Sequence, residues 1–200
     1  MLFRSMKIKR HIYWYSVSYE EYNKLTCEDG KFMCVEYTED DRKKYGNEIP
    51  ENVNVLGAGC FQYSPSLSSI SIPSSVSVIG YQCFKQCSLL SSISISSSVS
   101  VLDKDCFSYC SSLLSISIPS SVSVIGEACF CKCTSLSSIS VPSLVSVIGD
   151  DCFAGSSSLL SISITQTISK IGRWCFYGCS SLTSISIPLS VSVIGKDRKS

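Results

Sequence analysis

The chain has 200 residues, a formal net charge of +1 and a hydrophobic content of 44%. A near-neutral chain of this length can bury one core, and its overall charge gives no reason to expect binding to nucleic acid or to an anionic membrane surface. No apolar run approaches the roughly 18 residues that a membrane-spanning helix requires. We therefore expect one ordinary domain or one short solenoid, without membrane insertion.

The N-terminus is basic but lacks the apolar core of a signal peptide. Lys7, Lys9 and Arg10 interrupt every apolar run before such a core could form. The sequence as written therefore predicts a cytoplasmic protein.

Residues 1–46 do not fit the pattern of the rest of the chain. Residues 8–17 alternate like a β-strand with aromatic side chains on both faces. Asp29-Gly30 lies between two apolar runs, which is a strong hairpin signal, and the charged run of residues 38–45 predicts a solvated loop or an exposed helical turn. We predict that residues 1–46 are a small β-rich cap, because the first repeat of a solenoid otherwise leaves one side of its core open to water.

Residues 47–195 are a tandem repeat with a period of 23 residues. The copies share the pattern Leu-x-x-Ile-x-Ile-Pro-x-x-Val-x-x-Ile-Gly-x-x-Cys-Phe-x-x-Cys, with a few departures. Each Cys-Phe pair contributes one of six equally spaced phenylalanines: Phe61, Phe84, Phe107, Phe130, Phe153 and Phe176. One copy has too few apolar side chains to be stable alone, so neighbouring copies must stack and supply the missing burial and hydrogen bonds.

Each part of the repeat predicts a local structure. Residues 69–72 alternate Ser with Ile, which favours a short strand with Ile inward and Ser outward, and Pro73 ends that strand because it cannot donate to the ladder. Residues 76–79 predict a second short extended segment that ends at Gly80. In residues 81–87 the two Cys and the Phe are at helical spacing, which predicts a short helix or 3₁₀ turn with these side chains inward.

This pattern, seen in residues 113–133 with Cys129-Phe130, resembles the 23-residue BspA-like class of leucine-rich repeat. The resemblance covers residues 47–195, and every copy has Cys before the Phe where the family usually has Ala. It implies a right-handed β-rich leucine-rich-repeat solenoid of short parallel strands with short helical or 3₁₀ turns. Proteins of this class resemble bacterial and protist surface molecules, so the resemblance also implies a cell-surface location and adhesion to an unidentified protein partner, such as a host or matrix protein.

The chain contains 13 cysteines, and most of them recur in the same two positions of the repeat. Cysteine behaves as a small buried hydrophobe, so we interpret these thiols as core fillers. Zinc binding and disulfides are the alternatives: paired C-x₂-C ligand sets are missing, and stacked Cys would have parallel Cβ directions in a chain without a signal peptide. Cys131 lies in a variable position and is predicted to be the most reactive thiol.

Serine is the other overrepresented residue. Two Ser flank the first Ile of each predicted strand and should line the exposed face of the sheet; the pairs are Ser69 and Ser71, Ser92 and Ser94, Ser115 and Ser117, Ser138 and Ser140, Ser161 and Ser163, and Ser184 and Ser186. His11 is the only histidine and lies outside the array. A serine nucleophile needs an activating base, so the sequence predicts that the protein is not an enzyme. It also predicts no cofactor and no metal.

The variable positions of the repeat are where the identity of a partner would be encoded. They precede or follow the Cys-Phe pair, and Arg173 and Trp174 lie close to Tyr177 on one predicted turn. Trp, Tyr and Arg are favoured at binding hot spots. We name Arg173, Trp174, Tyr177, Tyr81 and Tyr109 as candidate partner-binding residues, although packing of the aromatic pair on the adjacent turn is the alternative.

The repeat stops within residues 196–200, a charged tail. Arg198-Lys199 stand where the next Cys-Phe pair would be. The last strand, expected at residues 184–187, would then expose a sheet edge, and self-association through that edge is a further expectation.

We predict a non-enzymatic protein-binding or adhesion module built on this scaffold. An intracellular interaction scaffold or signalling adaptor is the alternative, favoured by the missing signal peptide and by reduced thiols. Binding of ice or a glycan through the serine rows is a third hypothesis. Nucleic acid is not expected as a partner.

Overall fold

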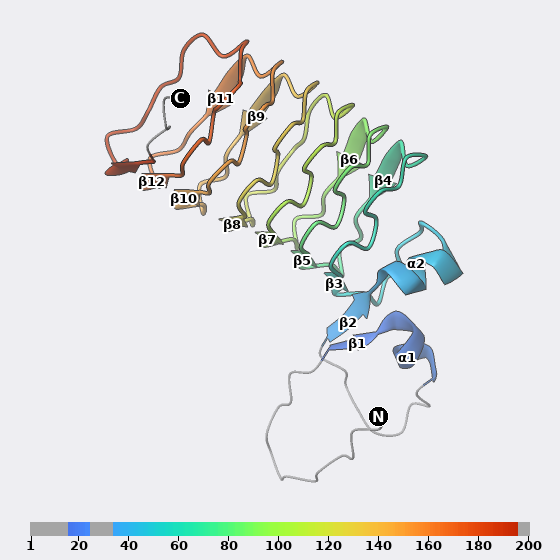
Figure 1. Ribbon diagram of the computed structural model, residues 1–200. Coiled ribbons are helices and arrows are strands. Elements are labelled where there is room, and N and C mark those ends of the chain that lie inside the picture. The colour runs from blue at the N-terminus through green and yellow to red at the C-terminus, as the bar shows by residue number, and fades with distance from the viewer. Residues whose placement is uncertain (1–15, 25–33, 196–200) are drawn as a thin grey trace, which may run out of the picture.

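The computed structural model describes residues 16–24 and 34–195, and in these ranges the chain is a parallel β-solenoid whose coils stack one on the next (Figure 1). A two-residue strand from each coil of the array belongs to a first ladder, which is interrupted once, between residues 125 and 147. These strands are β3 (Val55–Leu56), β5 (Val78–Ile79), β7 (Val101–Leu102), β8 (Val124–Ile125), β10 (Val147–Ile148), β12 (Lys170–Ile171) and β13 (Val193–Ile194). Pairing is parallel with a shift of one repeat, as between Val78 and Val101. The predicted fold class is confirmed.

A glycine follows most of these strands because neighbouring coils approach closely there. A Cβ added at Gly80 would lie 2.6 Å from the carbonyl oxygen of Leu56. Real Cβ atoms do not approach a backbone oxygen so closely, so this position of the repeat has no room for a side chain.

A second, interrupted ladder contains the Ser-Ile-Ser segments. Strand β4 (Ser69–Ser71) pairs with β6 (Ser92–Ser94), β9 (Ser138–Ser140) pairs with β11 (Ser161–Ser163), and Ser115 bridges to Ser138. The serines of these strands are exposed, and the central Ile packs inward. The prediction of outward Ser and inward Ile is confirmed.

The Cys-Phe turns form the third side of the coil. In the turn of residues 81–87, the N–H groups of Gln82, Phe84 and Gln86 donate to carbonyls of the next coil at 2.8–3.0 Å. The N–H groups between them donate within the turn, as from Lys85 to the carbonyl of Gln82 at 3.0 Å. Alternate residues therefore close the local turn and extend an intercoil ladder.

The structure contains no helix at these turns within the described residues, contrary to one of the two predicted forms. The predicted i to i+3 hydrogen bonds of a 3₁₀ turn are present, but they do not run consecutively. Gln82 and Gln86 have φ angles of 54° and 59°. A helix needs negative φ at successive residues, so these two positions turn the chain back to the ladder.

The core is a column of stacked phenylalanine rings beside buried thiols. From Phe61 to Phe176, consecutive ring centroids are 5.1–5.7 Å apart and their planes differ by 2–13°. The thiols next to these rings are buried; they are Cys60, Cys83, Cys106, Cys129, Cys152 and Cys175. All cysteines in the described ranges are free, so the interpretation of the repeated cysteines as core fillers agrees with the structure.

The described part of residues 1–46 continues the first ladder. Strand β1 (Ser16–Ser18) leads into helix α1 (Tyr19–Lys24), and β2 (Cys34–Tyr37) leads into helix α2 (Glu39–Tyr45). Strand β1 pairs with β2, and β2 with β3, all in parallel. The predicted hairpin at Asp29-Gly30 and most of the alternating segment of residues 8–17 lie outside the described residues. The division into a cap of residues 1–46, an array of residues 47–195 and a tail of residues 196–200 stays a prediction.

The charged run predicted as a loop or an exposed helical turn is helix α2. Thr38 and Asp41 form a capping box at its start, with the Thr38 Oγ1 accepting from the Asp41 N–H at 3.1 Å. Asp41 is buried, and its Oδ1 accepts a hydrogen bond from the Glu20 N–H at 2.8 Å. Asp41 thereby fastens α2 to the start of α1.

Arg42 of helix α2 closes the N-terminal end of the Cys-Phe ladder. Within the array, the carbonyl of each Cys before the Phe accepts the N–H of the Phe in the preceding coil. One repeat before Phe61 the equivalent residue is Thr38, whose N–H donates to Asp41 Oδ2 at 2.9 Å. The Arg42 Nε donates to the Cys60 carbonyl at 2.6 Å instead. The guanidinium also lies 5.7 Å from the centroid of the Phe61 ring. A charged side chain thus replaces both the missing amide and part of the missing ring stack.

The C-terminal end of the array is more exposed than its interior. Ile194 is 57% exposed, whereas the equivalent Ile148 is 1% exposed. The strand predicted at residues 184–187 is not formed. In this described coil, the backbone N–H groups of Ser181 and Ser192 donate to the preceding coil, and none of the N–H groups between them does so. Without those bonds the segment has no ladder partner. Self-association through this end stays a prediction.

We predict that Arg42→Ala destabilises the first coil of the array. The substitution leaves the Cys60 carbonyl without its charged donor, and a hydrogen bond to a charged group contributes about 1.5–3 kcal/mol. Urea unfolding should give a lower midpoint, and hydrogen exchange should accelerate first at residues 60–63. Lys43→Ala, on the same helix but exposed, is the matched control and should change neither quantity. Equal midpoints for wild type and Arg42→Ala would contradict the assignment.

Candidate binding face

The surface formed by the Cys-Phe turns carries the most variable side chains of the array. We call it the turn face; it comprises residues 58–63, 81–86, 104–109, 127–132, 150–155 and 173–178. In each turn the Cys and the Phe point into the core, while most of the other side chains point outward. The backbone of this face is fixed by the intercoil ladder, so neighbouring side chains are held in register.

The residue two positions before each Phe of the array and the residue two positions after it have left-handed backbone. The described non-glycine residues with positive φ lie in these two columns, and all have φ between 49° and 63°; they are Tyr63, Gln82, Gln86, Asp105, Tyr109, Ala128, Lys132, Asp151 and Trp174. Gly59, Gly155 and Gly178 occupy the same columns. Glycine adopts this conformation without steric cost and other residues do not. Larger side chains are therefore kept in these columns despite backbone strain.

Three of the sequence-predicted residues are together on the last described turn. Trp174 is 38% exposed and Tyr177 is 68% exposed, and the Tyr177 N–H donates to the Trp174 carbonyl at 3.0 Å. The side chain of Arg173 is exposed beside them, and its N–H donates to Asp150 Oδ1 at 2.8 Å. The turn thus presents a cation and two aromatic rings to solvent.

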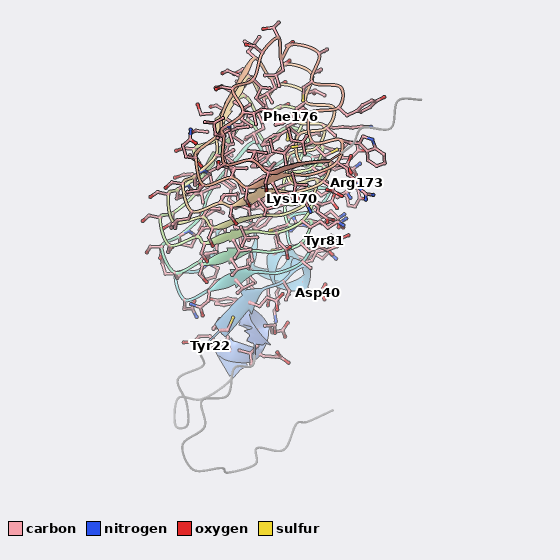
Figure 2. The ribbon with its side chains drawn as sticks, turned by 90° about the vertical axis from the view of Figure 1, so that its left-hand side faces the viewer. Tyr22, Asp40, Tyr81, Lys170, Arg173 and Phe176 are labelled. Carbon is pink, nitrogen blue, oxygen red and sulfur yellow. The ribbon has the colours of Figure 1, made fainter. Side chains whose placement is uncertain are left out.

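The other two predicted residues lie elsewhere on the same face. Tyr81 is in the same column as Arg173 but four repeats earlier, which is about 20 Å at the spacing of a parallel ladder; Figure 2 shows both at one edge of the molecule. Tyr109 is 37% exposed. It occupies the position of Gly178 in the last turn, but three repeats earlier. The structure therefore does not bring all five residues into one site.

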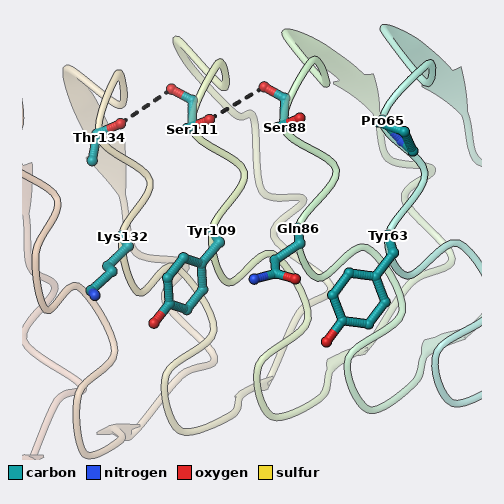
Figure 3. A pocket seen from close by; sticks show the side chains of 8 residues that line it. All are labelled: Tyr63, Pro65, Gln86, Ser88, Tyr109, Ser111, Lys132 and Thr134. Atoms are coloured by element: carbon teal, nitrogen blue, oxygen red, sulfur yellow. Dashed lines mark hydrogen bonds between the residues drawn. The ribbon is translucent and has the colours of Figure 1, made fainter.

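Tyr109 lies in a groove of about 510 Å³ that the sequence reasoning missed (Figure 3). One wall is the column of Tyr63, Gln86, Tyr109 and Lys132, which occupy the same position in four consecutive coils. The Lys132 Nζ lies 4.9 Å from the centroid of the Tyr109 ring. The signal was present as a shared position in the repeat, but the four residues have no common chemical type that would have drawn attention to it.

Charged side chains in the middle of the turn face pair between coils. Lys85 Nζ lies 3.4 Å from Asp105 Oδ1, and Lys104 Nζ lies 2.7 Å from Glu127 Oε2. The pKa of Asp151 is raised by burial and by the neighbouring carboxylate of Asp150. The two Lys-carboxylate pairs each join side chains of neighbouring coils.

The second cysteine of each repeat has a role beyond packing. Its thiol donates to the carbonyl of the Phe in the preceding coil, as from Cys133 Sγ to the Phe107 oxygen at 3.2 Å. Ser156 occupies this position in one coil, and its hydroxyl donates to the Phe130 oxygen at 2.8 Å. Ser64 occupies it in the first coil, where its buried hydroxyl has no partner among the described residues. The exchange of Cys with Ser was the sequence signal for a hydrogen-bonding position.

Cys131, predicted to be the most reactive thiol, is only half-exposed. Burial raises its pKa, the Asp151 carboxylate raises it further, and Lys132 lowers it. Burial and the Asp151 carboxylate both reduce the thiolate fraction at neutral pH, so the thiol is less reactive than an ordinary exposed cysteine.

The described residues offer neither a metal centre nor a membrane span. Within residues 16–24 and 34–195, no group of three or more His, Cys, Asp or Glu side chains is arranged to hold a metal ion. Neither helix in those ranges combines the length and the apolar composition that crossing a bilayer demands.

The coil architecture and the Leu, Ile and Phe positions of the repeat define a leucine-rich-repeat protein. The family model for the BspA type leucine-rich repeat region matches residues 46–159 and 103–198, with six copies. The chain belongs to the BspA type leucine-rich-repeat family. No curated protein matches it significantly.

Solved structures of bacterial leucine-rich-repeat proteins are similar to this chain. A leucine-rich repeat protein from Bacteroides ovatus is 29% identical with a TM-score of 0.58, over 74% of this chain and 47% of that one. A leucine rich cell surface protein from Faecalibacterium prausnitzii is 27% identical with a TM-score of 0.68, over 75% and 43%. The leucine-rich repeat protein of T. pallidum is 25% identical with a TM-score of 0.54, over 76% and 79%. The chain thus matches less than half the length of the first two.

We predict that Asp151→Asn accelerates alkylation of Cys131. Removing the carboxylate removes a cause of the raised pKa, so a larger fraction of the thiol is ionised at pH 8. The pH at half-maximal rate should move down, as measured by iodoacetamide labelling and peptide mass spectrometry. Lys132→Ala removes the cation that lowers this pKa and should move the midpoint up. A shift of the same sign in both variants would contradict this electrostatic account.

Proposed function

We propose that the protein is a non-enzymatic protein-binding module that contacts its partner with the turn face. The observation that carries the proposal is the exposed cluster of Arg173, Trp174 and Tyr177 on a turn whose backbone is fixed by the intercoil ladder. Arg, Trp and Tyr are the residues most enriched at hot spots. A rigid scaffold also lowers the entropy that is lost when side chains are immobilised on binding.

The family supports this proposal. Leucine-rich-repeat proteins are generally non-enzymatic scaffolds that bind other proteins. In this chain the repeat positions that build the core are nearly constant, whereas the turn-face positions differ from coil to coil. Such a division suits a scaffold whose variable side chains determine the partner.

Adhesion at a cell surface is the more specific form of the proposal. It is supported by the F. prausnitzii relative, whose description is a leucine rich cell surface protein. The partner would then be a protein of a host, a matrix or a neighbouring cell. Labelling of intact cells with an impermeant reagent tests this form, and failure to label the protein would contradict it.

The double substitution Trp174→Ala and Tyr177→Ala should weaken partner binding about tenfold or more, because hot-spot aromatics contribute on the order of 2 kcal/mol each when buried in an interface. Partners are first captured with the wild-type chain and identified by mass spectrometry. The affinity of each purified partner is then measured by calorimetry for wild type and variant.

Leu160→Ala is the matched control for this experiment. Leu160 is 63% exposed and follows the core leucine Leu159, outside the turn face, so its removal should leave the affinity unchanged. If the double variant and the wild type have equal affinities for every captured partner, the assignment of Arg173, Trp174 and Tyr177 to the binding site is wrong.

A further inference from the structure

We propose that the groove around Tyr63 and Tyr109 binds a proline-rich peptide in the polyproline II conformation, with an acidic residue next to one of its prolines. The inference rests on the proposed function, since it names the class of partner for one part of the turn face. The groove is separate from the cluster at residues 173–177, so the two sites can be tested independently.

The spacing of the two tyrosines suits this ligand. Tyr63 and Tyr109 occupy the same position two coils apart, which corresponds to about 10 Å at the spacing of a parallel ladder. A polyproline II helix has three residues per turn and a rise of about 3.1 Å, so residues three apart face the same side at about 9 Å. Two prolines in a P-x-x-P segment can therefore lie on the two rings at once.

The chemistry of the two rings points to the same ligand. Aromatic grooves recognise proline-rich segments because the pyrrolidine rings pack on flat apolar surfaces and the polyproline II backbone is already ordered. Tyr63 is 63% exposed and Tyr109 is 37% exposed. Figure 3 shows the two rings in one row with Gln86 between them, and Pro65 in the opposite row. The groove thus has two apolar platforms separated by a polar side chain.

Polar groups in the groove are available to a bound backbone. A polyproline II chain has no internal hydrogen bonds, so its carbonyls accept donors from a partner. Within the part of the chain that the structure describes, no hydrogen bond engages the Gln86 side-chain amide or the hydroxyls of Tyr63 and Tyr109. Ser111 and Thr134, in contrast, donate to the carbonyls of Ser88 and Ser111 at 3.3 and 3.4 Å. The free donors therefore lie along the tyrosine column.

Lys132 adds a charge preference at one end. Its Nζ lies over the Tyr109 ring at 4.9 Å, and no carboxylate within the described ranges is paired with it. An acidic residue one or two positions beyond the proline on Tyr109 would reach this ammonium group.

Fluorescence anisotropy of labelled synthetic peptides with the full 200-residue chain tests the proposal. The probes are decapeptides with two prolines three positions apart and two glutamates after the second proline, and the same sequence reversed. Wild type should bind one of them saturably. Tyr63→Ala with Tyr109→Ala should weaken binding about tenfold or more, whereas Leu160→Ala should not change it.

Lys132→Ala should make the glutamate peptide and its glutamine analogue bind equally, and a peptide with the prolines four positions apart should bind more weakly than the three-spaced one. Absence of saturable binding to both peptide orders, or equal binding by wild type and the double tyrosine variant, would overturn the proposal. So would tyrosine-dependent binding of a linear oligosaccharide such as cellohexaose in place of the peptides. If partners of the Trp174 cluster still bind while the peptides do not, only the groove assignment fails.

Discussion

The alternating direction of the backbone N–H groups in the Cys-Phe turn is the constraint on which the rest of this structure depends. One set of amides closes the turn within its own coil, and the other set joins that coil to the next. The turn is therefore as much a part of the intercoil ladder as the strands are. Left-handed residues on both sides of each Phe make the alternation possible, because they reverse the chain between consecutive local bonds.

Other features of the molecule follow from this ladder. Coils held at ladder spacing bring the Phe rings to 5.1–5.7 Å, so the rings must stack in parallel. The same spacing places the second Cys of each coil within reach of a carbonyl of the coil before it, which explains why Cys or Ser is found there. The ladder also needs a donor at its N-terminal end, and Arg42 supplies it. The variable side chains of the turn face are carried on this fixed backbone.

Much of the fold could be predicted from the sequence because the repeat aligns the chain with itself. The Ser-Ile alternation gave the outward and inward faces correctly, and the recurring Cys next to Phe indicated a thiol-lined core. The helix considered for residues 81–87 was wrong because Cys83 and Cys87 have a spacing that suits a helix and also suits turns interleaved with a ladder. Only the intercoil hydrogen bonds distinguish the two, and they are not encoded in the pattern of a single copy.

The candidate site was harder to predict for a related reason. Arg173, Trp174 and Tyr177 were found because they are close in sequence and belong to residue types favoured at interfaces. Gln86 and Tyr109 were each recognised as variable positions, but the groove was missed because its wall is built from one residue of each of four coils. Arg42 was missed because a charged run outside the repeat predicts an exposed segment, whereas its role depends on a carbonyl that the repeat leaves open.

Native-state hydrogen exchange of Phe130→Ala tests most directly the claim that the coils are stable only through their shared ladder. The substitution removes one ring from the middle of the stack, and truncation of a buried Phe costs about 3–5 kcal/mol. The account predicts faster exchange of the ladder amides of Phe107 and Phe153 as well as that of residue 130. Faster exchange confined to the substituted coil, with Phe107 and Phe153 as protected as in the wild type, would contradict it.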